Sequence, residues 1–133
     1  MSKIIHTSGK RKRSTARATL SKGKGIIKIN SVPLELFTPA FARERIREPL
    51  ILAGKVVKTI DIRINVNGGG RIAQSEAVRL AIAKGLVEFT EDEKLKRLFL
   101  TYDRHLLVAD PRRTEKCKPN RSKPRARRQK SYR

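Results

Sequence analysis

The segment GKRKRSTARA, residues 9–18, places five cationic side chains beside two hydroxyl groups. Arginine binds phosphate through two parallel hydrogen bonds, and serine or threonine hydroxyls donate to phosphate oxygens. Because the first 24 residues contain no acidic residue, contact with nucleic-acid phosphates is favoured over a solvated, mobile loop or an import signal. The RNA-binding residues expected in this part of the chain are Lys10, Arg11, Lys12, Arg13, Ser14, Arg17, Lys22 and Lys24.

The end of the chain, KPNRSKPRARRQKSYR at residues 118–133, is a second basic segment. Its prolines favour an extended backbone, and it has too few apolar residues to build a core. We expect RNA to order it, although a solubilising tail is the alternative. The 23 residues from Pro111 onward reach about 75 Å when extended. The further RNA-binding residues expected are Arg112, Arg113, Arg121, Lys123, Arg125, Arg127 and Arg128.

The composition limits the possible partners and sites. A formal net charge of +21 on 133 residues causes strong self-repulsion unless a polyanion neutralises it, so nucleic acid is the expected partner. The sequence has no run of about 18 apolar residues and no signal-peptide block, and we expect a soluble, intracellular protein that binds no membrane. Cys117 is the only cysteine, and His6 and His105 lie far apart, so neither a disulfide nor a metal site is expected.

The stretch NVNGGGR, residues 65–71, raises the question of a nucleotide-binding loop. It completes neither GxxxxGKS/T nor GxGxxG. The glycines instead favour a tight turn before a helix whose N-terminus, beside Arg71, holds an RNA phosphate. No nucleophile motif accompanies Asp103 and His105, so docking of the tail is favoured over catalysis for that segment. We expect no enzyme activity, no cofactor, no small-molecule substrate and no homo-oligomer.

These residues need a folded support, and the middle of the chain has the composition for one. The alternation in TIDIRINVN, residues 59–67, predicts a strand whose covered face is formed by Ile60, Ile62, Ile64 and Val66. A β-hairpin is predicted earlier in the chain, with residues 16–21 paired to residues 25–30 through a basic SKGKG turn. A further short strand is predicted near residue 4.

Helices are predicted on both sides of this strand in the sequence. The first begins at Pro39 and is broken by Pro49. The second follows the glycines and ends at Gly85, and its buried stripe is Ile72, Ala77, Val78, Ala81 and Ile82. A capping box of Thr90 and Glu93 opens the third, whose buried residues are Leu95, Leu98 and Phe99.

This order of elements predicts an α+β fold, a two-layer sandwich of one mixed sheet with helices on one face. Residues 1–109 are expected to form one domain, which includes the basic segment 1–24. Residues 110–133 are expected to form an extended basic tail that reaches beyond the domain.

Five motifs resemble, in this order, the small-subunit ribosomal protein nine family: GKRKRSTARATL, DIRINVNGGGR, QSEAVRLAIAKGLVEF, LTYDRHLLVADPRR and the terminal QKSYR. The resemblance covers essentially the whole chain. YDRHLLVADPRRTE together with ARRQKSYR is most similar to the archaeal form. Residues 116–124, KCKPNRSKP, depart from the glycine-containing stretch that is usual in this branch, so the path of this segment is left open.

The resemblance implies a fold similar to the second domain of small-subunit ribosomal protein five, with a left-handed βαβ crossover. It also implies a place in the head of the cytoplasmic small subunit, on the 3′ domain of its rRNA and beside other head proteins. The tail then contacts the peptidyl-site tRNA, and the residues carried over are Lys130, Ser131, Tyr132 and Arg133. A general nucleic-acid-packaging protein is the alternative, and an enzyme related by fold to small-molecule kinases is disfavoured by the missing phosphate loop.

Overall fold

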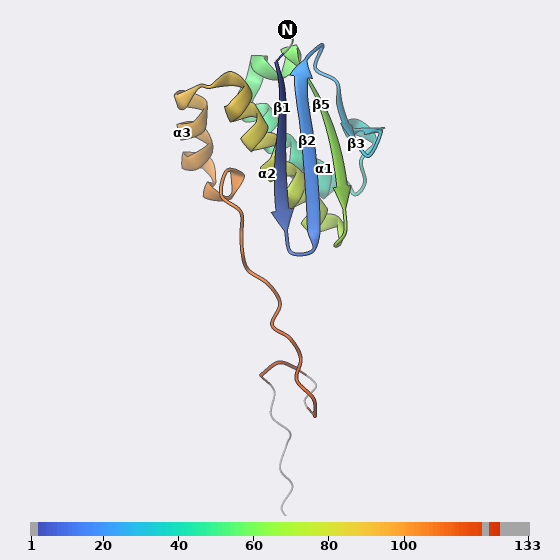
Figure 1. Ribbon diagram of the computed structural model, residues 1–133. Helices are drawn as coiled ribbons and strands as arrows, with labels where there is room; N and C mark the ends of the chain where they lie inside the picture. Colours follow the sequence, from blue (N-terminus) through green and yellow to red (C-terminus); the bar gives the residue numbers. More distant parts are fainter. Residues whose placement is uncertain (1–2, 121–122, 126–133) are drawn as a thin grey trace, which may run out of the picture.

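The computed structural model describes residues 3–120 and 123–125 of the chain. A five-stranded sheet in the order β1-β2-β5-β3-β4 forms one layer, and the helices lie on one face of it (Figure 1). Neighbouring strands are antiparallel except β3 and β5. The predicted α+β two-layer sandwich is confirmed. The strands are β1 (Ile4–Arg11), β2 (Ser14–Lys22), β3 (Ile27–Ile29), β4 (Val32–Pro33) and β5 (Ile60–Asn67).

The predicted pairing of residues 16–21 with residues 25–30 is wrong. Instead, β2 pairs with β1 through a turn at Lys12 and Arg13, and its other edge pairs with β5. β3 lies parallel to β5 on the far side. Alternation predicts which face of a strand is covered but not which strand lies beside it, and the apolar β5 takes the central position. The β3–β5 pair, with a helix in its connection, is a βαβ unit, and the hand of the crossover stays a prediction.

The SKGKG segment is held against the start of β5. The Asp61 carboxylate accepts hydrogen bonds from the backbone N–H groups of Ile26 at 3.0 Å and Lys24 at 2.8 Å, and these bonds lower the pKa of Asp61. A side chain at Gly23 would place its Cβ 2.0 Å from the Asp61 Cγ. The segment therefore carries the chain from β2 across β5 to β3 and does not form a hairpin turn.

Three helices cover one face of the sheet or its margin, and the first passes through the predicted break. Pro49 lies inside α1 and is itself buried, and the helix ends only before Gly54, which adopts φ 59°. A proline removes one N–H donor, and the burial of Ile46 and Leu50 on the same side keeps the helix continuous. The helices are α1 (Ala40–Ala53), α2 (Arg71–Thr90) and α3 (Glu93–Tyr102), with short 3-10 turns η1 (Leu34–Leu36), η2 (Gly54–Thr59) and η3 (Arg104–Leu106).

Gly85 does not end the second helix, as predicted, but lies inside it. α2 continues to Thr90, and Glu91 closes it in the left-handed region at φ 54°. A Cβ at Gly85 would lie 2.4 Å from the Leu20 Cδ1 on β2. The glycine thus serves close packing of the helix on the sheet, a role that the sequence pattern does not distinguish from termination.

The cap of α3 also differs from the prediction. Asp92 is the cap residue, and its carboxylate accepts a hydrogen bond from the Lys94 N–H at 2.8 Å. The Thr90 hydroxyl instead donates to the Leu86 carbonyl of α2 at 2.8 Å. The two helices follow each other so closely that Thr90 belongs to the end of the first, and the acidic Asp92 takes over the N-terminus of the second.

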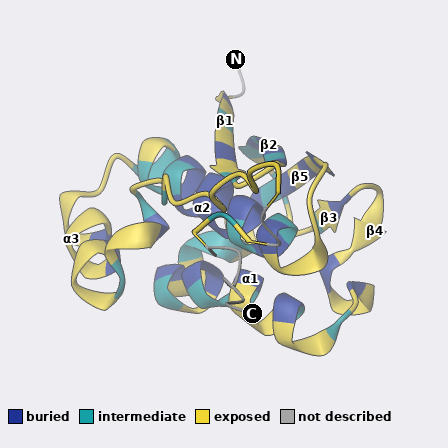
Figure 2. Cartoon of the chain, turned by 90° about the horizontal axis from the view of Figure 1, so that it is seen from below, coloured by how far each residue is buried: buried dark blue, intermediate teal, exposed yellow. Residues whose placement is uncertain are grey.

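The core lies between the sheet and the helices α1 and α2, as Figure 2 shows in dark blue. The four residues predicted on the covered face of β5 are all buried, as are the predicted core residues Ala77, Val78, Ala81, Ile82, Leu95 and Phe99. Two predicted core residues are exposed, Ile72 by 57% and Leu98 by 44%. Ile72 lies in the first turn of α2, beyond the edge of the sheet contact. Within the described residues, no helix is long and apolar enough to cross a membrane.

Candidate nucleic-acid interface

The basic hairpin turn and the glycine loop are packed together at one end of the sheet (Figure 1). The Ser14 hydroxyl is buried and donates to the Gly68 carbonyl at 2.7 Å, and the Gln74 amide donates to the same oxygen at 3.1 Å. Gly68 adopts φ 77°, and a Cβ there would lie 2.5 Å from the Arg13 carbonyl oxygen. This close approach requires glycine. Ser14 therefore positions the loop, and its hydroxyl is already used.

The N-terminus of α2 lies beside this contact between Ser14 and the glycine loop. Gly70 is its cap residue, no side chain caps the helix, and its first turn contains no acidic residue. The free N–H groups and the helix dipole give this end a partial positive charge that favours an anion. Arg71, Lys12 and Arg13 are exposed around it. The structure thus brings together the glycine loop and the hairpin turn, which the sequence places more than fifty residues apart.

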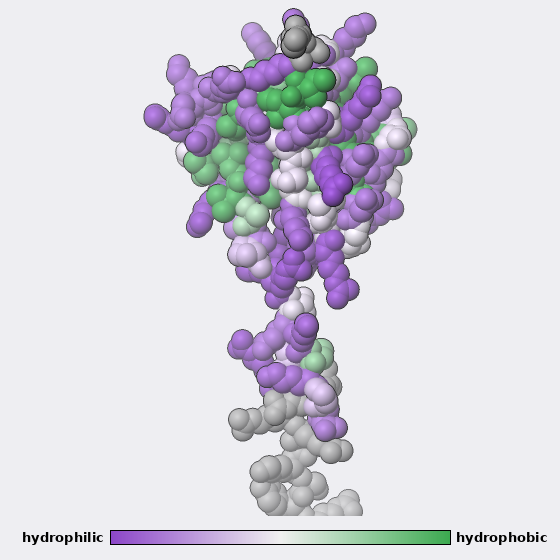
Figure 3. Space-filling model, viewed as in Figure 1, coloured by the Kyte–Doolittle hydropathy of each residue, from purple (hydrophilic) through white to green (hydrophobic). Residues whose placement is uncertain are grey.

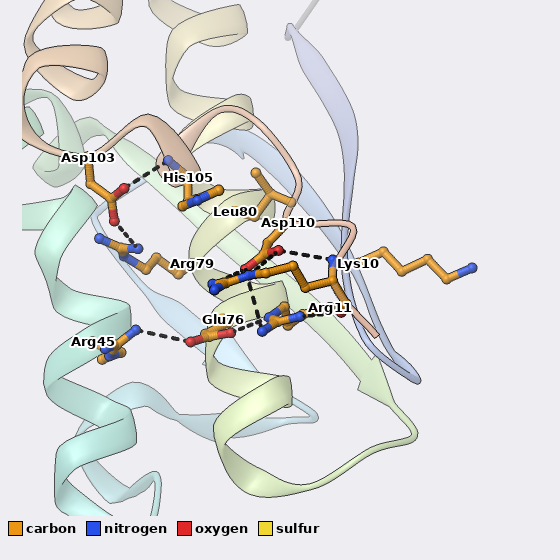
Figure 4. Close-up of a pocket in the computed structure, with 10 residues that line it drawn as sticks. Lys10, Arg11, Arg45, Glu76, Arg79, Leu80, Asp103, His105 and Asp110 are labelled. Atoms are coloured by element: carbon orange, nitrogen blue, oxygen red, sulfur yellow. Dashed lines mark hydrogen bonds and ion pairs between the residues drawn. The ribbon is translucent and has the colours of Figure 1, made fainter. Parts of the chain in front are cut away.

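Arg11 has a different environment from its neighbours, because its side chain is only 13% exposed. Its Nε binds the Glu76 carboxylate at 2.7 Å, and one terminal nitrogen approaches the Asp110 carboxylate at 3.4 Å. The other donates to the Arg112 carbonyl at 2.9 Å. Figure 4 shows these groups converging between β1, α2 and the segment after η3. Arg11 therefore anchors the first residues of the tail to the domain.

Asp110 completes this anchor. Its carboxylate accepts hydrogen bonds from the Arg112 guanidinium at 2.7 and 3.0 Å and from the Arg112 N–H at 3.0 Å. These bonds, with the nearby charge of Arg11, hold the pKa of Asp110 far below its usual value, and the carboxylate raises the pKa of Arg112. The group is thus charged at neutral pH. Both acidic residues of this joint, Glu76 and Asp110, are neutralised by arginines of the domain and the tail.

Asp103 and His105 have a structural role at the turn before the tail, in agreement with the prediction that this segment is not catalytic. The Asp103 carboxylate accepts from the His105 backbone N–H and from the Arg79 guanidinium, each at 2.9 Å. Burial raises the pKa of Asp103, but the hydrogen bonds from His105 and Arg79 outweigh it and lower the pKa. Arg79 also pairs with Glu48 of α1 and is buried. The cluster ties α1 and α2 to the turn that precedes the tail.

The remaining predicted RNA-binding residues lie in several places. Lys10, Arg17 and Lys22 are exposed on the sheet, Lys24 is exposed between β2 and β3, and Arg113 is exposed at the start of the tail. Farther along the tail, Lys123 and Arg125 are exposed, and Arg125 pairs with Glu115 at 2.9 Å. The predicted residues outside the described part of the chain are Arg121, Arg127, Arg128, Lys130, Ser131, Tyr132 and Arg133.

The sequence did not point to Glu76 and Asp110 of the Arg11 anchor, or to Arg79 of the neighbouring cluster, as functional positions. In the sequence, Glu76 belongs to an ordinary helix pattern and Asp110 to the ADPRR motif. Only the fold brings both carboxylates to Arg11. Across residues 3–120 and 123–125, no three histidine, cysteine or acidic side chains gather as a metal site. Cys117 is free and exposed. The site offers exposed cations and free N–H groups, which suit phosphate.

A family model described as ribosomal protein S9/S16 matches residues 9–133. This chain belongs to the ribosomal protein S9/S16 family. It is 51% identical over 133 residues to the small ribosomal subunit protein uS9 of Methanococcus vannielii, with 98% of this chain and 99% of that protein covered. Proteins of the same name from Methanococcus maripaludis strains C7 and C5 are 52% identical with the same coverage.

Membership of this family confirms the predicted resemblance, including its archaeal type, since the relatives come from methanogenic archaea. The ribosomal protein S9/S16 family is a structural family, so the chain is not an enzyme. The match begins at Gly9 in β1, three residues before the hairpin turn, and includes the whole tail. The joint between hairpin, glycine loop and tail therefore lies entirely within the matched region.

Proposed function

We propose that this chain is a structural constituent of the small subunit of the cytoplasmic ribosome. In this proposal it binds rRNA of the 3′ domain in the head, beside other head proteins, and its tail contacts the peptidyl-site tRNA. The observation that carries the proposal is the concentration of unpaired cations at the end of the domain from which the tail leaves. Family membership supports the ribosomal setting.

The cations at this end are free because the acids there are already used. Glu76 and Asp110 are bound by Arg11 and Arg112. Among the residues that the structure describes, no carboxylate pairs with the exposed Lys12, Arg13 or Arg71. Lysine and arginine in this state replace the counterions of folded rRNA, and the free N–H groups of α2 add an anion site.

The direction of the tail supports a second contact. The Arg11 anchor fixes residues 110–112 beside the hairpin turn, and Figure 1 shows the following segment leading away from the domain at that end. A chain anchored at one point and extended beyond it reaches groups that the domain does not touch. Under this proposal, Lys130, Ser131, Tyr132 and Arg133 form the end that meets tRNA.

The proposal is tested with small subunits assembled from the full chain and from a chain that ends at Lys130. Both chains should co-sediment with the subunit through a moderate-salt sucrose gradient, because the rRNA contacts lie elsewhere. Loss of Ser131, Tyr132 and Arg133 should speed tRNA dissociation from the peptidyl site by about tenfold, the effect of losing one charge-assisted hydrogen bond. A Lys94→Gln substitution on α3 serves as the control that leaves both measurements unchanged.

The outcomes separate the parts of the proposal. If the full chain fails to co-sediment and prefers duplex DNA over rRNA at equal salt, the ribosomal assignment is wrong and a packaging protein takes its place. If both chains co-sediment and tRNA dissociates equally fast, the rRNA function stands and the tRNA contact is wrong.

A further inference from the structure

The face of the sheet opposite the helices is uncovered in the described structure. Residues that alternate toward the helices, such as Gly9, Ala18 and Ile64, are buried, whereas their neighbours on the other face are exposed or partly so. Figure 3 views the molecule from this side and shows hydrophilic (purple) and neutral (white) residues over the middle and lower parts of the sheet, with a hydrophobic (green) patch near the N-terminus. The side chains on this open face are Ile4, His6, Ser8, Lys10, Thr15, Arg17, Thr19, Ser21, Lys28, Pro33, Asp61, Arg63, Asn65 and Asn67.

The cations of the open face form a diagonal stripe across four strands. Lys10 lies opposite Thr15, two residues before Arg17. Arg17 lies opposite Asn65, two residues after Arg63. Lys28 lies directly opposite Arg63. Diagonal neighbours in a sheet are about 7 to 8 Å apart and direct neighbours about 5 Å apart, so the stripe of Lys10, Arg17, Arg63 and Lys28 spans about 20 Å.

The cationic stripe has one acidic neighbour on the open face, Asp61, whose pKa is lowered by backbone hydrogen bonds, the strongest from Ile26, and in smaller part by the charge of Arg63. The four side chains of the stripe form no ion pair within the described residues, where the helix layer pairs its arginines with glutamates. The five strands contain one acidic residue, Asp61. Its carboxylate lies at the end of the face and accepts backbone hydrogen bonds from Lys24 and Ile26. An exposed, unpaired row of cations is complementary to a linear polyanion.

The residues around the stripe indicate which polyanion. They are small hydroxyl and amide side chains, which donate to phosphate oxygens and ribose hydroxyls. No tyrosine, phenylalanine or tryptophan lies on the open face, and its one aromatic ring, His6, is hydrogen-bonded to the Thr19 hydroxyl at 3.1 Å, so the face offers no row of platforms for stacking unpaired bases. Among the described strand residues, Ile4 at the start of β1 is the one exposed large apolar side chain of this face, which has no tryptophan or phenylalanine anchor of the kind that membrane-binding surfaces use. The chemistry therefore fits the backbone of a double-helical RNA.

We propose that the open sheet face binds the backbone of a double-helical rRNA segment through Lys10, Arg17, Arg63 and Lys28. This contact begins at Lys10 near the hairpin end and extends across the sheet to Lys28, and it rests on the proposed ribosomal function. The sheet face contacts RNA by shape and charge, without reading base sequence. Thr19, opposite Arg63 on one side and His6 on the other, lies at the centre of the footprint.

The first test compares two triple variants of the full chain. One replaces three stripe cations, Arg17→Gln, Lys28→Gln and Arg63→Gln, and the matched control replaces three exposed cations of α3, Lys94→Gln, Lys96→Gln and Arg97→Gln. Binding to a transcript of the rRNA 3′ domain is measured between 50 and 200 mM salt. Each lost duplex phosphate contact lowers the slope of log affinity against log salt by about 0.9. The stripe variant should lose about 2 to 3 in slope, and the control should keep the wild-type value.

Thermal unfolding first checks that both variants fold. Four outcomes then decide the matter. A slope loss in the stripe variant alone supports the proposal. Equal slopes in the stripe variant and the wild type overturn it while the ribosomal function stands. Equal losses of slope in both triple variants also overturn it, because binding then depends on total charge and not on the open sheet face. Failure of the wild type itself to bind the transcript overturns this inference and the proposed function together.

The second test locates the RNA. An iron-EDTA probe is attached to a Thr19→Cys, Cys117→Ser chain, which holds a single cysteine, and the control is a Lys96→Cys, Cys117→Ser chain. In assembled subunits, the Thr19 probe should cleave both strands of one rRNA helix, and the Lys96 probe should leave that helix intact. Cleavage of single-stranded rRNA alone, or contact with an acidic protein and no rRNA cleavage, overturns the proposal.

Discussion

Several arginines of the helix layer form ion pairs with carboxylates, whereas those of the open sheet face do not within the described residues. On the helix side, Arg79 is buried between Glu48 and Asp103, and Arg45 and Arg47 pair with glutamates. On the open face, Arg17 and Arg63 are exposed and unpaired within the described residues. The net charge is the sum of two populations, one that holds the fold together and one that is left for a polyanion. A count of basic residues alone does not separate them.

The same substitution in the two regions provides the largest expected contrast. Arg79→Met removes a buried guanidinium and leaves Glu48 and Asp103 facing each other without a cation, which should cost about 3 kcal/mol of unfolding free energy. Arg63→Met on the open face should change it by less than about 0.5 kcal/mol. Urea denaturation of the full chain measures both. Equal effects would contradict the division between structural and free arginines.

A second contrast compares the two faces of one strand. Gly9 faces α2, and a Cβ there would lie 2.1 Å from the Ala77 carbonyl oxygen and 2.8 Å from the Ala81 nitrogen. Both are backbone atoms, so Gly9→Ala must push the helix from the sheet and should cost about 2 to 3 kcal/mol. Ser8→Ala, on the open face, should stay within about 0.5 kcal/mol. Thermal unfolding midpoints would show the difference, and a tolerated Gly9→Ala would disprove the close packing.

A smaller effect should appear in acid. The pKa values of Asp61, Asp103 and Asp110 are lowered in the folded protein. A lowered pKa adds stability above the unfolded value of 3.8, and this contribution is lost as the pH falls through the folded pKa. The unfolding free energy should therefore decline below about pH 4. Asp103→Asn should flatten part of this decline, and Glu88→Gln, at an exposed position, should leave it unchanged.

The strongest predictions from the sequence concern elements with clear local signals. The alternation of β5 predicts both its existence and its covered face, because side chains in a strand alternate with period two. The glycine loop and the helix after it are likewise found where the pattern places them. The sequence misplaced the roles of Pro49 and Gly85, because each residue type is compatible with two positions in a helix. Pro49 and Gly85 commonly break or end helices, and only burial against the sheet or core shows that both lie inside one.

The joint at the root of the tail shows the same limit for the site. Arg11 belonged to the predicted phosphate-binding cluster, yet its guanidinium binds Glu76 and the tail. These partners are 65 and 101 residues away along the chain. The assignment of Arg11 to rRNA stays a prediction, and the fold gives it a second role in fixing the direction of the tail.

The sequence by itself determined the family, the excess of positive charge, its concentration in the two ends of the chain and the faces of the main strand and helix. These properties depend on composition and on short-range periodicity, which are fully present in the linear order of residues. Only the tertiary structure decided the strand order, the Arg11 anchor and the diagonal stripe of Lys10, Arg17, Arg63 and Lys28. Strand neighbours and ion pairs form between residues far apart in the chain, so whether a cation is free or paired becomes visible only after folding.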